Sequence, residues 1–321
     1  MIVKKINQDD RETYNECAKA YGTVFNSLEW LSIFGEAIQV YGLYDNKGNI
    51  VGGFHLFNKR KYGLTIFCNS PFTPFMGPFI RIDVQNPVKI MNTWKEALAA
   101  VSDFIDKLSY SIISFDLSAA VVDTQPFIWK KFKVVPNYTY LVDLSMPVEG
   151  ILKNMSSNRR NDINKGTKDG LSVRKIEDLE IIDQLVAKTF SRQGMRHNEF
   201  HQRKVLFEFA NNDCSFAFAA FKGDTPIACT FCIYDKRRVY ALLGGYDHEN
   251  KNDVAGVLCL WEAIKYSKGL GLSYFDFEGS MVPRIERYYR EFGGTLTPYY
   301  RINKAKLPIE ILLKIYKREL F

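Results

Sequence analysis

An internal repeat is the feature that most constrains the fold of this chain. The segment Phe115-Asp116-Leu117 recurs as Phe275-Asp276-Phe277, an offset of 160 that also relates Phe132 to Phe292 and Tyr140 to Tyr300. Farther upstream, Ile50 and Phe54 precede Ile227 and Phe231 by 177, and Val3 to Ile6 precedes Val173 to Ile176 by 170. Matches in the same order whose offsets differ by loop-sized steps are typical of a duplicated domain.

The repeated order of elements predicts an α/β fold, with a mixed sheet in each of two tandem domains. A length of 321 residues fits two domains of about 150 residues. We expect the first domain to span residues 1–143 and the second 144–321, the latter opening with a helix over 147–170. Within the first domain, the apolar spacing after Ser27 predicts a helix from Ser27 to Tyr41.

Composition limits the function classes only weakly. A net charge of +7 allows anionic partners such as nucleotides, phosphates or RNA without requiring them. The chain has no apolar run of the roughly 20 residues that a membrane span needs, so we expect a cytoplasmic protein. Cys229 and Cys232 are expected on opposite faces of one strand, as buried free thiols rather than metal ligands.

Several segments resemble one family. They are Tyr140 to Ser145, Ser157 to Lys165, Gly244-Gly245-Tyr246-Asp247, Phe275 to Ser280, and Tyr288 to Gly294, together with the Phe72 to Pro78 loop of the first half. With the duplication, they resemble the GNAT acyltransferase fold in its tandem form, as in the Fem-type peptidyltransferases and Fem-like acetyltransferase-domain proteins. This resemblance implies transfer of an acyl group from acyl-CoA or aminoacyl-tRNA to an amine acceptor.

The acyl donor is the part of this expectation that the sequence supports least. The family's pyrophosphate-binding turn, Gln/Arg-x-x-Gly-x-Gly/Ala, is replaced here by Glu249 to Gly256. The long coiled-coil arm of some Fem proteins is absent from the sequence as well. An alternative is therefore a catalytically inactive duplicated domain that binds an anionic ligand or RNA.

The second half supplies the candidate catalytic and donor-binding residues. Tyr246 follows two glycines and could protonate a leaving group or donate a hydrogen bond; Glu278 ends an apolar strand, where burial would suit it to act as a base. Each also has a structural alternative: Tyr246 could simply pack in the core, and Glu278 could pair with a nearby arginine. The start of the following helix is the candidate cofactor site, through Asn252, Val254, Ala255 and Gly256.

Candidate substrate-binding residues come from both halves. Arg159, Arg160 and Lys165 form a cationic group suited to phosphate or carboxylate, although a solvated helix face is the commoner explanation. Arg284 adds a cation after Glu278, and Phe75 could line an acceptor groove or close the first core. We expect no metal. The acceptor is an amine on a cell-wall precursor, a saccharide or a small molecule, tRNA is a possible partner, and the oligomeric state is open.

The carboxyl-terminal segment carries a further pattern. Ile309 to Phe321 is predicted as a basic amphipathic helix, compatible with an anionic membrane surface or with docking on the protein itself.

Overall fold

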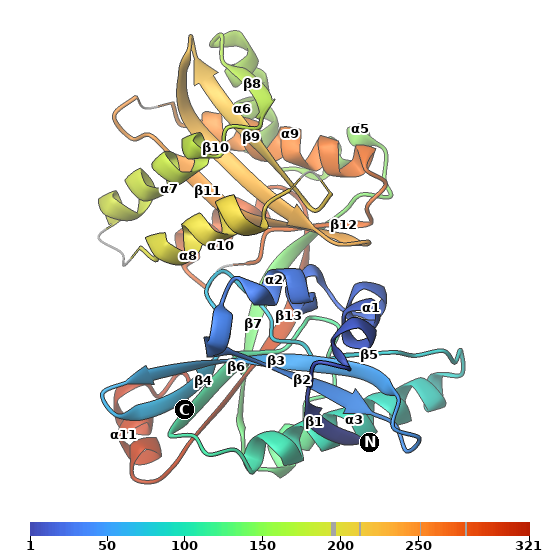
Figure 1. Cartoon of the computed structure of the whole chain (residues 1–321). Coiled ribbons are helices and arrows are strands. Elements are labelled where there is room, and N and C mark those ends of the chain that lie inside the picture. The colour runs from blue at the N-terminus through green and yellow to red at the C-terminus, as the bar shows by residue number, and fades with distance from the viewer. Residues whose placement is uncertain (194–196, 212, 251, 280) are drawn as a thin grey trace. The chain divides into compact units, whose positions relative to one another are not determined.

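The computed structural model describes residues 1–193, 197–211, 213–250, 252–279 and 281–321 (Figure 1). The chain divides into two compact units: Met1–Asn137 with Pro298–Phe321, and Tyr138–Thr297. This division differs from the expected boundary at residue 143. Strands β7 (Lys133–Asp143) and β13 (Thr295–Ala305) each contribute residues to both units, so the chain crosses between the units inside strands rather than in a linker.

Unit 1 contains the first repeat. Its remaining elements are β1 (Ile2–Lys5), α1 (Arg11–Tyr21), α2 (Leu28–Ser32), β2 (Ile38–Tyr44), β3 (Ile50–Lys61), β4 (Leu64–Cys68), β5 (Phe79–Ile80), α3 (Pro87–Asp106), β6 (Ile112–Asp116), α4 (Gln125–Trp129) and α11 (Ile309–Tyr316), with short 3-10 turns at Val24–Asn26 and Gly35–Ala37. The sheet order is β1-β2-β3-β4-β6-β13. The β4/β6 pair is parallel, which makes the sheet mixed, as expected.

The predicted helix from Ser27 to Tyr41 is wrong beyond its first turns. Ser27 does cap α2, since its hydroxyl oxygen accepts a hydrogen bond from the Trp30 amide at 3.3 Å. The helix ends at Ser32, however, and residues from Ile38 onward form β2 because they pair with β3. Tertiary pairing overrides the local apolar spacing here.

Unit 2 contains the second repeat. Besides its part of β7 and β13, it comprises α5 (Val148–Asn154), α6 (Ser157–Lys168), β8 (Ser172–Ile176), α7 (Glu180–Gln193), α8 (Glu199–Lys204), a π-helical turn (Val205–Phe209), β9 (Ser215–Lys222), β10 (Thr225–Tyr234), β11 (Arg238–Tyr246), α9 (Ala255–Gly269), β12 (Tyr274–Asp276) and α10 (Pro283–Arg290). The single helix expected over 147–170 is two helices. Met155 and Ser156 are extended, and the Ser156 hydroxyl caps the start of α6.

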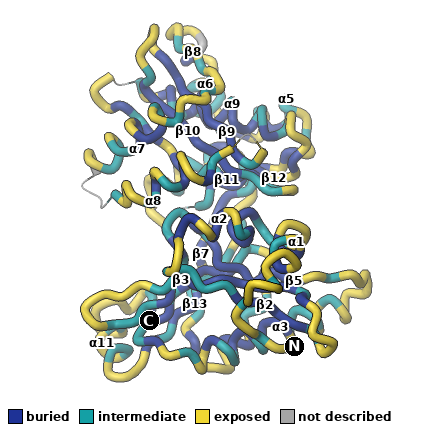
Figure 2. Tube along the Cα trace, in the orientation of Figure 1, coloured by how far each residue is buried: buried dark blue, intermediate teal, exposed yellow. Residues whose placement is uncertain are grey.

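The sheet of unit 2 runs in the order β7-β12-β11-β10-β9-β8, and its strands β9 and β10 are buried on both faces over most of their length (Figure 2). Helix α7 lies very close to β11 at Gly245, where a Cβ atom would be 2.6 Å from the Leu185 carbonyl carbon and 2.7 Å from the Val186 amide. Helix α9 packs against the same strands, and its Cys259 thiol lies 3.6 Å from the Ala228 carbonyl oxygen. Cys229 and Cys232 are buried and free, as predicted.

The repeated Phe-Asp pair occupies the same kind of position in both units. Asp116 accepts hydrogen bonds from the Arg301 guanidinium at 2.9 and 2.8 Å, and Asp276 accepts one from Arg238 at 3.1 Å and one from the Thr139 hydroxyl at 2.6 Å. Both aspartates are buried. This geometry gives the repeated aspartate a structural role at the strand end in both units.

Candidate active site

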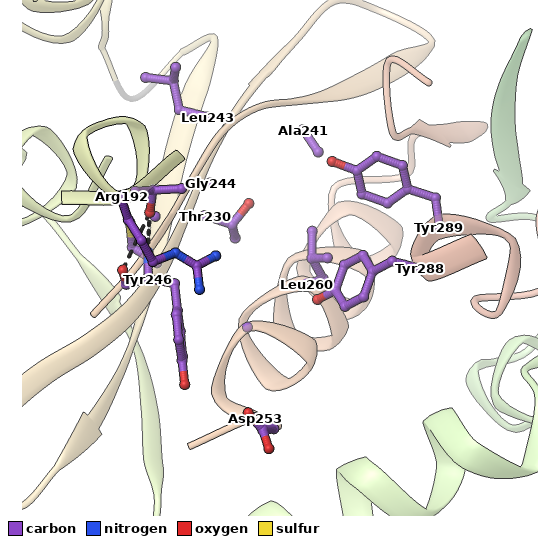
Figure 3. A pocket seen from close by; sticks show the side chains of 14 residues that line it. Arg192, Thr230, Ala241, Leu243, Gly244, Tyr246, Asp253, Leu260, Tyr288 and Tyr289 are labelled. Carbon is purple, nitrogen blue, oxygen red and sulfur yellow. Dashed lines mark hydrogen bonds between the residues drawn. The ribbon is translucent and has the colours of Figure 1, made fainter. Parts of the chain in front are cut away.

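A pocket of about 390 Å³ opens in unit 2 where β11 separates from β12 (Figure 3). The two strands pair in parallel only from Arg238 to Tyr240. Beyond Tyr240, β11 continues to Tyr246 while β12 ends at Asp276, so the sheet opens along one side of β11. The lining is Thr189, Arg192, Cys229, Thr230, Ala241, Leu243, Gly244, Gly245, Tyr246, Asp253, Gly256, Leu260, Tyr288 and Tyr289.

Gly244 presents its backbone to this opening. The amide of Asp247 donates to the Ile227 carbonyl at 2.8 Å. This hydrogen bond fixes which residues of β11 direct their backbone amide and carbonyl groups toward β10. Gly244 lies opposite Thr230 in a pair whose amide and carbonyl groups point away from β10. A Cβ atom at Gly244 would have the Cys229 carbonyl oxygen, at 4.0 Å, as its nearest neighbour, so the glycine leaves the pocket floor open.

Tyr246 lines the pocket, as expected for a catalytic candidate, and its backbone is held firmly. Its amide donates to the Thr189 hydroxyl on α7 at 2.8 Å. Its own hydroxyl is buried and has no hydrogen bond of acceptable geometry with any described residue. Burial raises the pKa of this hydroxyl, partly opposed by the Asn252 backbone. The hydroxyl therefore stays protonated at neutral pH and is able to donate.

Two tyrosines of α10 form the opposite wall of the pocket (Figure 3). The Tyr289 ring stacks on Phe277 at 4.9 Å between centroids, and the Arg159 guanidinium lies 4.5 Å from the centre of the Tyr288 ring. Burial, with a smaller effect of the Glu278 charge, raises the pKa of Tyr289 to about 12. These contacts hold both rings in the wall, and because burial raises the pKa of each tyrosine, their hydroxyls remain protonated at neutral pH.

Glu278 lies next to the pocket rather than in its lining. It has a positive φ of 58° and donates its amide to the Asp276 carboxylate at 2.8 Å. Its Oε1 atom is buried without a hydrogen bond to any residue that the structure describes. Burial, followed by the charge of Asp276, raises the pKa of Glu278 well above its usual range. A carboxyl group in this condition is a candidate proton acceptor.

The residues predicted to bind the donor fit phosphate poorly. The side-chain oxygen of Asn252 accepts from the Val254 amide at 3.0 Å, and its carbonyl accepts from the Ala255 amide at 3.2 Å, so two of the first amides of α9 are already used. Val254 and Ala255 are buried. Of the four predicted residues only Gly256 lines the pocket, beside the carboxylate of Asp253, which would repel a phosphate.

The predicted substrate-binding residues do not gather at the pocket. Arg159 is paired with Asp162 at 2.7 Å and Glu291 at 2.8 Å, and Arg160 donates to carbonyl oxygens at the end of α5. These contacts give both arginines structural roles, so the anion site expected from them is not supported. Lys165 and Arg284 are exposed outside the lining.

Phe75 belongs to the other unit. Its buried ring packs edge to face on Phe25 and Tyr299, at 6.3 and 5.7 Å. The neighbouring Met76 is also buried, and its amide donates to the Asp116 carbonyl at 3.1 Å. The segment thus packs beside the end of β6 in the core of unit 1, which is the second of the two possibilities open for Phe75.

Several pocket residues were not predicted as site residues. Thr189 and Arg192 come from α7, Thr230 from β10 and Tyr289 from α10. Thr230 is buried among apolar neighbours on its strand, and a lone hydroxyl in such a run is the signal that could have identified it. The sequence around the α7 residues does not mark them as site residues, because it is the packing of α7 against β11 that brings them to the pocket.

Comparisons with known proteins identify the fold. Residues 153–289 match the acetyltransferase (GNAT) domain model. FemX superposes with a TM-score of 0.71 over 98% of this chain and 99% of its own, at 13% identity. L-PGS from Bacillus licheniformis superposes with a TM-score of 0.56 over 99% of this chain and 98% of its own, at 12% identity. A tandem GNAT protein from the clavulanic acid biosynthesis pathway superposes with a TM-score of 0.51 over 94% of this chain and 98% of its own, at 9% identity. A search of curated proteins found no match.

These likenesses define the class of the protein. It is a mixed α/β protein made of two GNAT-like units. In its second unit, residues 153–289 match the acetyltransferase (GNAT) domain model, and the whole chain shares its tandem fold with FemX. Among the described residues, no helix is both long and apolar enough to cross a membrane.

Proposed function

We propose that unit 2 is an N-acyltransferase or aminoacyltransferase that moves an acyl group from acyl-CoA or aminoacyl-tRNA to an amine acceptor, such as a cell-wall precursor, a saccharide or a small molecule. The observation that carries the proposal is the opening of the sheet beside β11. There Gly244 and Tyr246 line one pocket of a size suited to an acyl group and an amine.

The Gly244 amide is the candidate oxyanion donor. Attack of the amine nitrogen on the acyl carbonyl places a negative charge on the carbonyl oxygen, and a fixed backbone N–H in a partly enclosed pocket stabilises that charge. Donors of this kind are worth about 3 kcal/mol of the activation free energy. The rigid β10/β11 pair holds this amide in place before the substrate arrives.

Two side chains are assigned the proton transfers. The amine loses a proton as the new C–N bond forms, and we assign the Glu278 carboxyl group, next to the pocket, as its acceptor. The bond from the carbonyl carbon to the donor's sulfur or oxygen then breaks, and the protonated Tyr246 hydroxyl gives its proton to that leaving atom. The Asp253 carboxylate in the lining suits an ammonium group better than a phosphate.

Ligand-dependent melting of the full chain tests the proposal. A donor at a hundred times its dissociation constant adds about 2.7 kcal/mol to the free energy of unfolding. We would compare acetyl-CoA, free CoA, aminoacylated tRNA and deacylated tRNA. A shift with one acylated donor, larger than with its deacylated form, supports acyl transfer and identifies the donor. A shift with deacylated tRNA alone favours the inactive binding domain.

A Tyr246→Phe variant separates chemistry from binding. Its hydroxyl makes no hydrogen bond of acceptable geometry with a described residue, so the variant should melt at about the same temperature as the parent. Turnover of the identified donor should fall by roughly 100-fold if the hydroxyl protonates the leaving group. Unchanged turnover would remove Tyr246 from the mechanism.

A further inference from the structure

Helix α11 exposes an apolar face in unit 1 (Figure 2). Ile311, Leu312, Ile315 and Tyr316 are 56, 60, 70 and 79% exposed. Their spacing places them on one continuous side of the helix, while Leu313, on the other side, is partly buried. A soluble domain seldom exposes so many large apolar side chains together unless they contact something.

Basic side chains surround this face. Lys306, Lys314, Lys317 and Arg318 are exposed on and beside α11, and the acids of the same segment are Glu310, paired with Lys314 at 2.6 Å, and Glu319. The uncovered apolar side chains are thus accompanied by an excess of positive charge.

The β3–β4 hairpin adds to the same end of the sheet (Figure 1). The Ser111 amide donates to the Thr65 carbonyl at 2.8 Å, and the Lys306 amide donates to the Ser111 carbonyl at 3.0 Å, which joins the hairpin to the segment before α11. The hairpin exposes Lys59, Arg60, Lys61 and Tyr62, the last at 89%. We call these hairpin residues, with Lys306, Leu307 and the exposed residues of 311–318, the α11 surface.

We propose that the α11 surface docks on an anionic lipid bilayer. Apolar side chains on one side of a short helix can enter the boundary between headgroups and acyl chains, while neighbouring lysines and arginines contact lipid phosphates. Tyr62 and Tyr316 carry an apolar ring and a polar hydroxyl, which suits the same boundary. A second copy of the chain fits less well, because it would bring two sets of basic side chains together.

Vesicle co-sedimentation of the full chain tests this docking. We expect binding to vesicles of phosphatidylcholine with phosphatidylglycerol, and at least about tenfold weaker binding to phosphatidylcholine alone. Ile311→Ser with Ile315→Ser should weaken binding to the anionic vesicles at least about tenfold. Both side chains are exposed, so the fold should tolerate the change. Val88→Ser with Met91→Ser, at exposed positions of α3, is the matched control and should bind as the parent does.

Charge is tested separately from apolar contact. Lys317→Glu with Arg318→Glu should also weaken binding to anionic vesicles at least about tenfold, whereas Lys47→Glu with Lys89→Glu, elsewhere in unit 1, should have a clearly smaller effect. The proposal is overturned if the parent does not sediment with anionic vesicles or if the serine pair at 311 and 315 leaves binding unchanged. A dimer that only this serine pair dissociates, without vesicle binding, would assign the surface to a second copy instead.

Discussion

The Arg238 guanidinium donates to the buried Asp276 carboxylate at 3.1 Å, and the same carboxylate accepts the backbone amide of Glu278 at 2.8 Å. One ion pair therefore fixes the end of β12 at the position where the sheet opens. Its counterpart in unit 1, between Arg301 and Asp116, closes an equivalent strand end.

Asp276→Asn should destabilise unit 2 by about 3 kcal/mol, because it leaves the Arg238 charge largely buried and unpaired. Hydrogen exchange should show the loss of protection in β11 and β12. Asp116→Asn, the matched change, should lower protection in β6 and the neighbouring part of β13 instead. Equal loss of protection in both units from either variant would contradict this separation.

We expect His55 to make unit 1 sensitive to acid. It lies on β3, fully buried, and neither ring nitrogen has a partner among the described residues. Burial lowers the pKa of His55 from 6.5 to about 3. Because the pKa of His55 is lower in the folded protein than in the unfolded chain, its contribution to folding stability is complete above about pH 6.5. This contribution is lost as the pH falls toward 3.

The free energy of unfolding should therefore fall by up to about 1.4 kcal/mol per pH unit from this one group as the pH falls from 6.5 to 5. The melting temperature should fall with it. His55→Leu should flatten the dependence, and His248→Leu, at an exposed position, should not. A profile that His55→Leu leaves as steep as before would assign the acid sensitivity to other groups.

Gly244 and Gly245 are adjacent in sequence but should respond oppositely to alanine. At Gly245 a Cβ atom would be within 2.8 Å of the α7 backbone and the Cys229 thiol, so Gly245→Ala should cost about 2 kcal/mol of stability. At Gly244 the methyl group meets no atom closer than 4.0 Å and would enter the pocket. Gly244→Ala should therefore keep the melting temperature but reduce turnover, which a denaturation series and a transfer assay would separate.

The repeat made much of the scaffold predictable from the sequence. Phe115 and Phe275 are both fully buried, and each precedes an aspartate held by an arginine, because the same local pattern meets the same kind of sheet in both units. The duplication therefore indicated the mixed sheets and the strand ends without knowledge of long-range contacts.

The site was less predictable because its residues depend on contacts between distant segments. Arg159 has a side chain and a local sequence typical of an anion-binding residue, but it pairs with Glu291, which lies more than a hundred positions away in the chain. Thr189 reaches the pocket because α7 packs against β11, where its hydroxyl also forms hydrogen bonds with the Tyr246 backbone. Tyr246 itself was selected from the sequence because it follows two glycines at the end of a predicted strand, and it lies in the pocket lining.

Glu278 should show opposite effects on stability and activity. Its raised pKa means that the folded protein holds the proton more tightly than the unfolded chain, so its contribution to stability is complete below the ordinary pKa near 4.5 and is lost as the pH rises through the raised value. Glu278→Gln removes this titration. The variant should therefore melt higher than the parent at alkaline pH, while its turnover falls by about 100-fold because the proton acceptor is gone.

Glu262→Gln, on the surface of α9, is the control and should change neither property by much. The pH profile of turnover adds a second measurement. If Glu278 accepts the proton, turnover of the parent should fall at acidic pH, and the Glu278→Gln variant should lack this acidic limb. A Glu278→Gln variant that gains stability yet keeps both its turnover and its acidic limb would show that Glu278 shapes the strand end and takes no part in proton transfer.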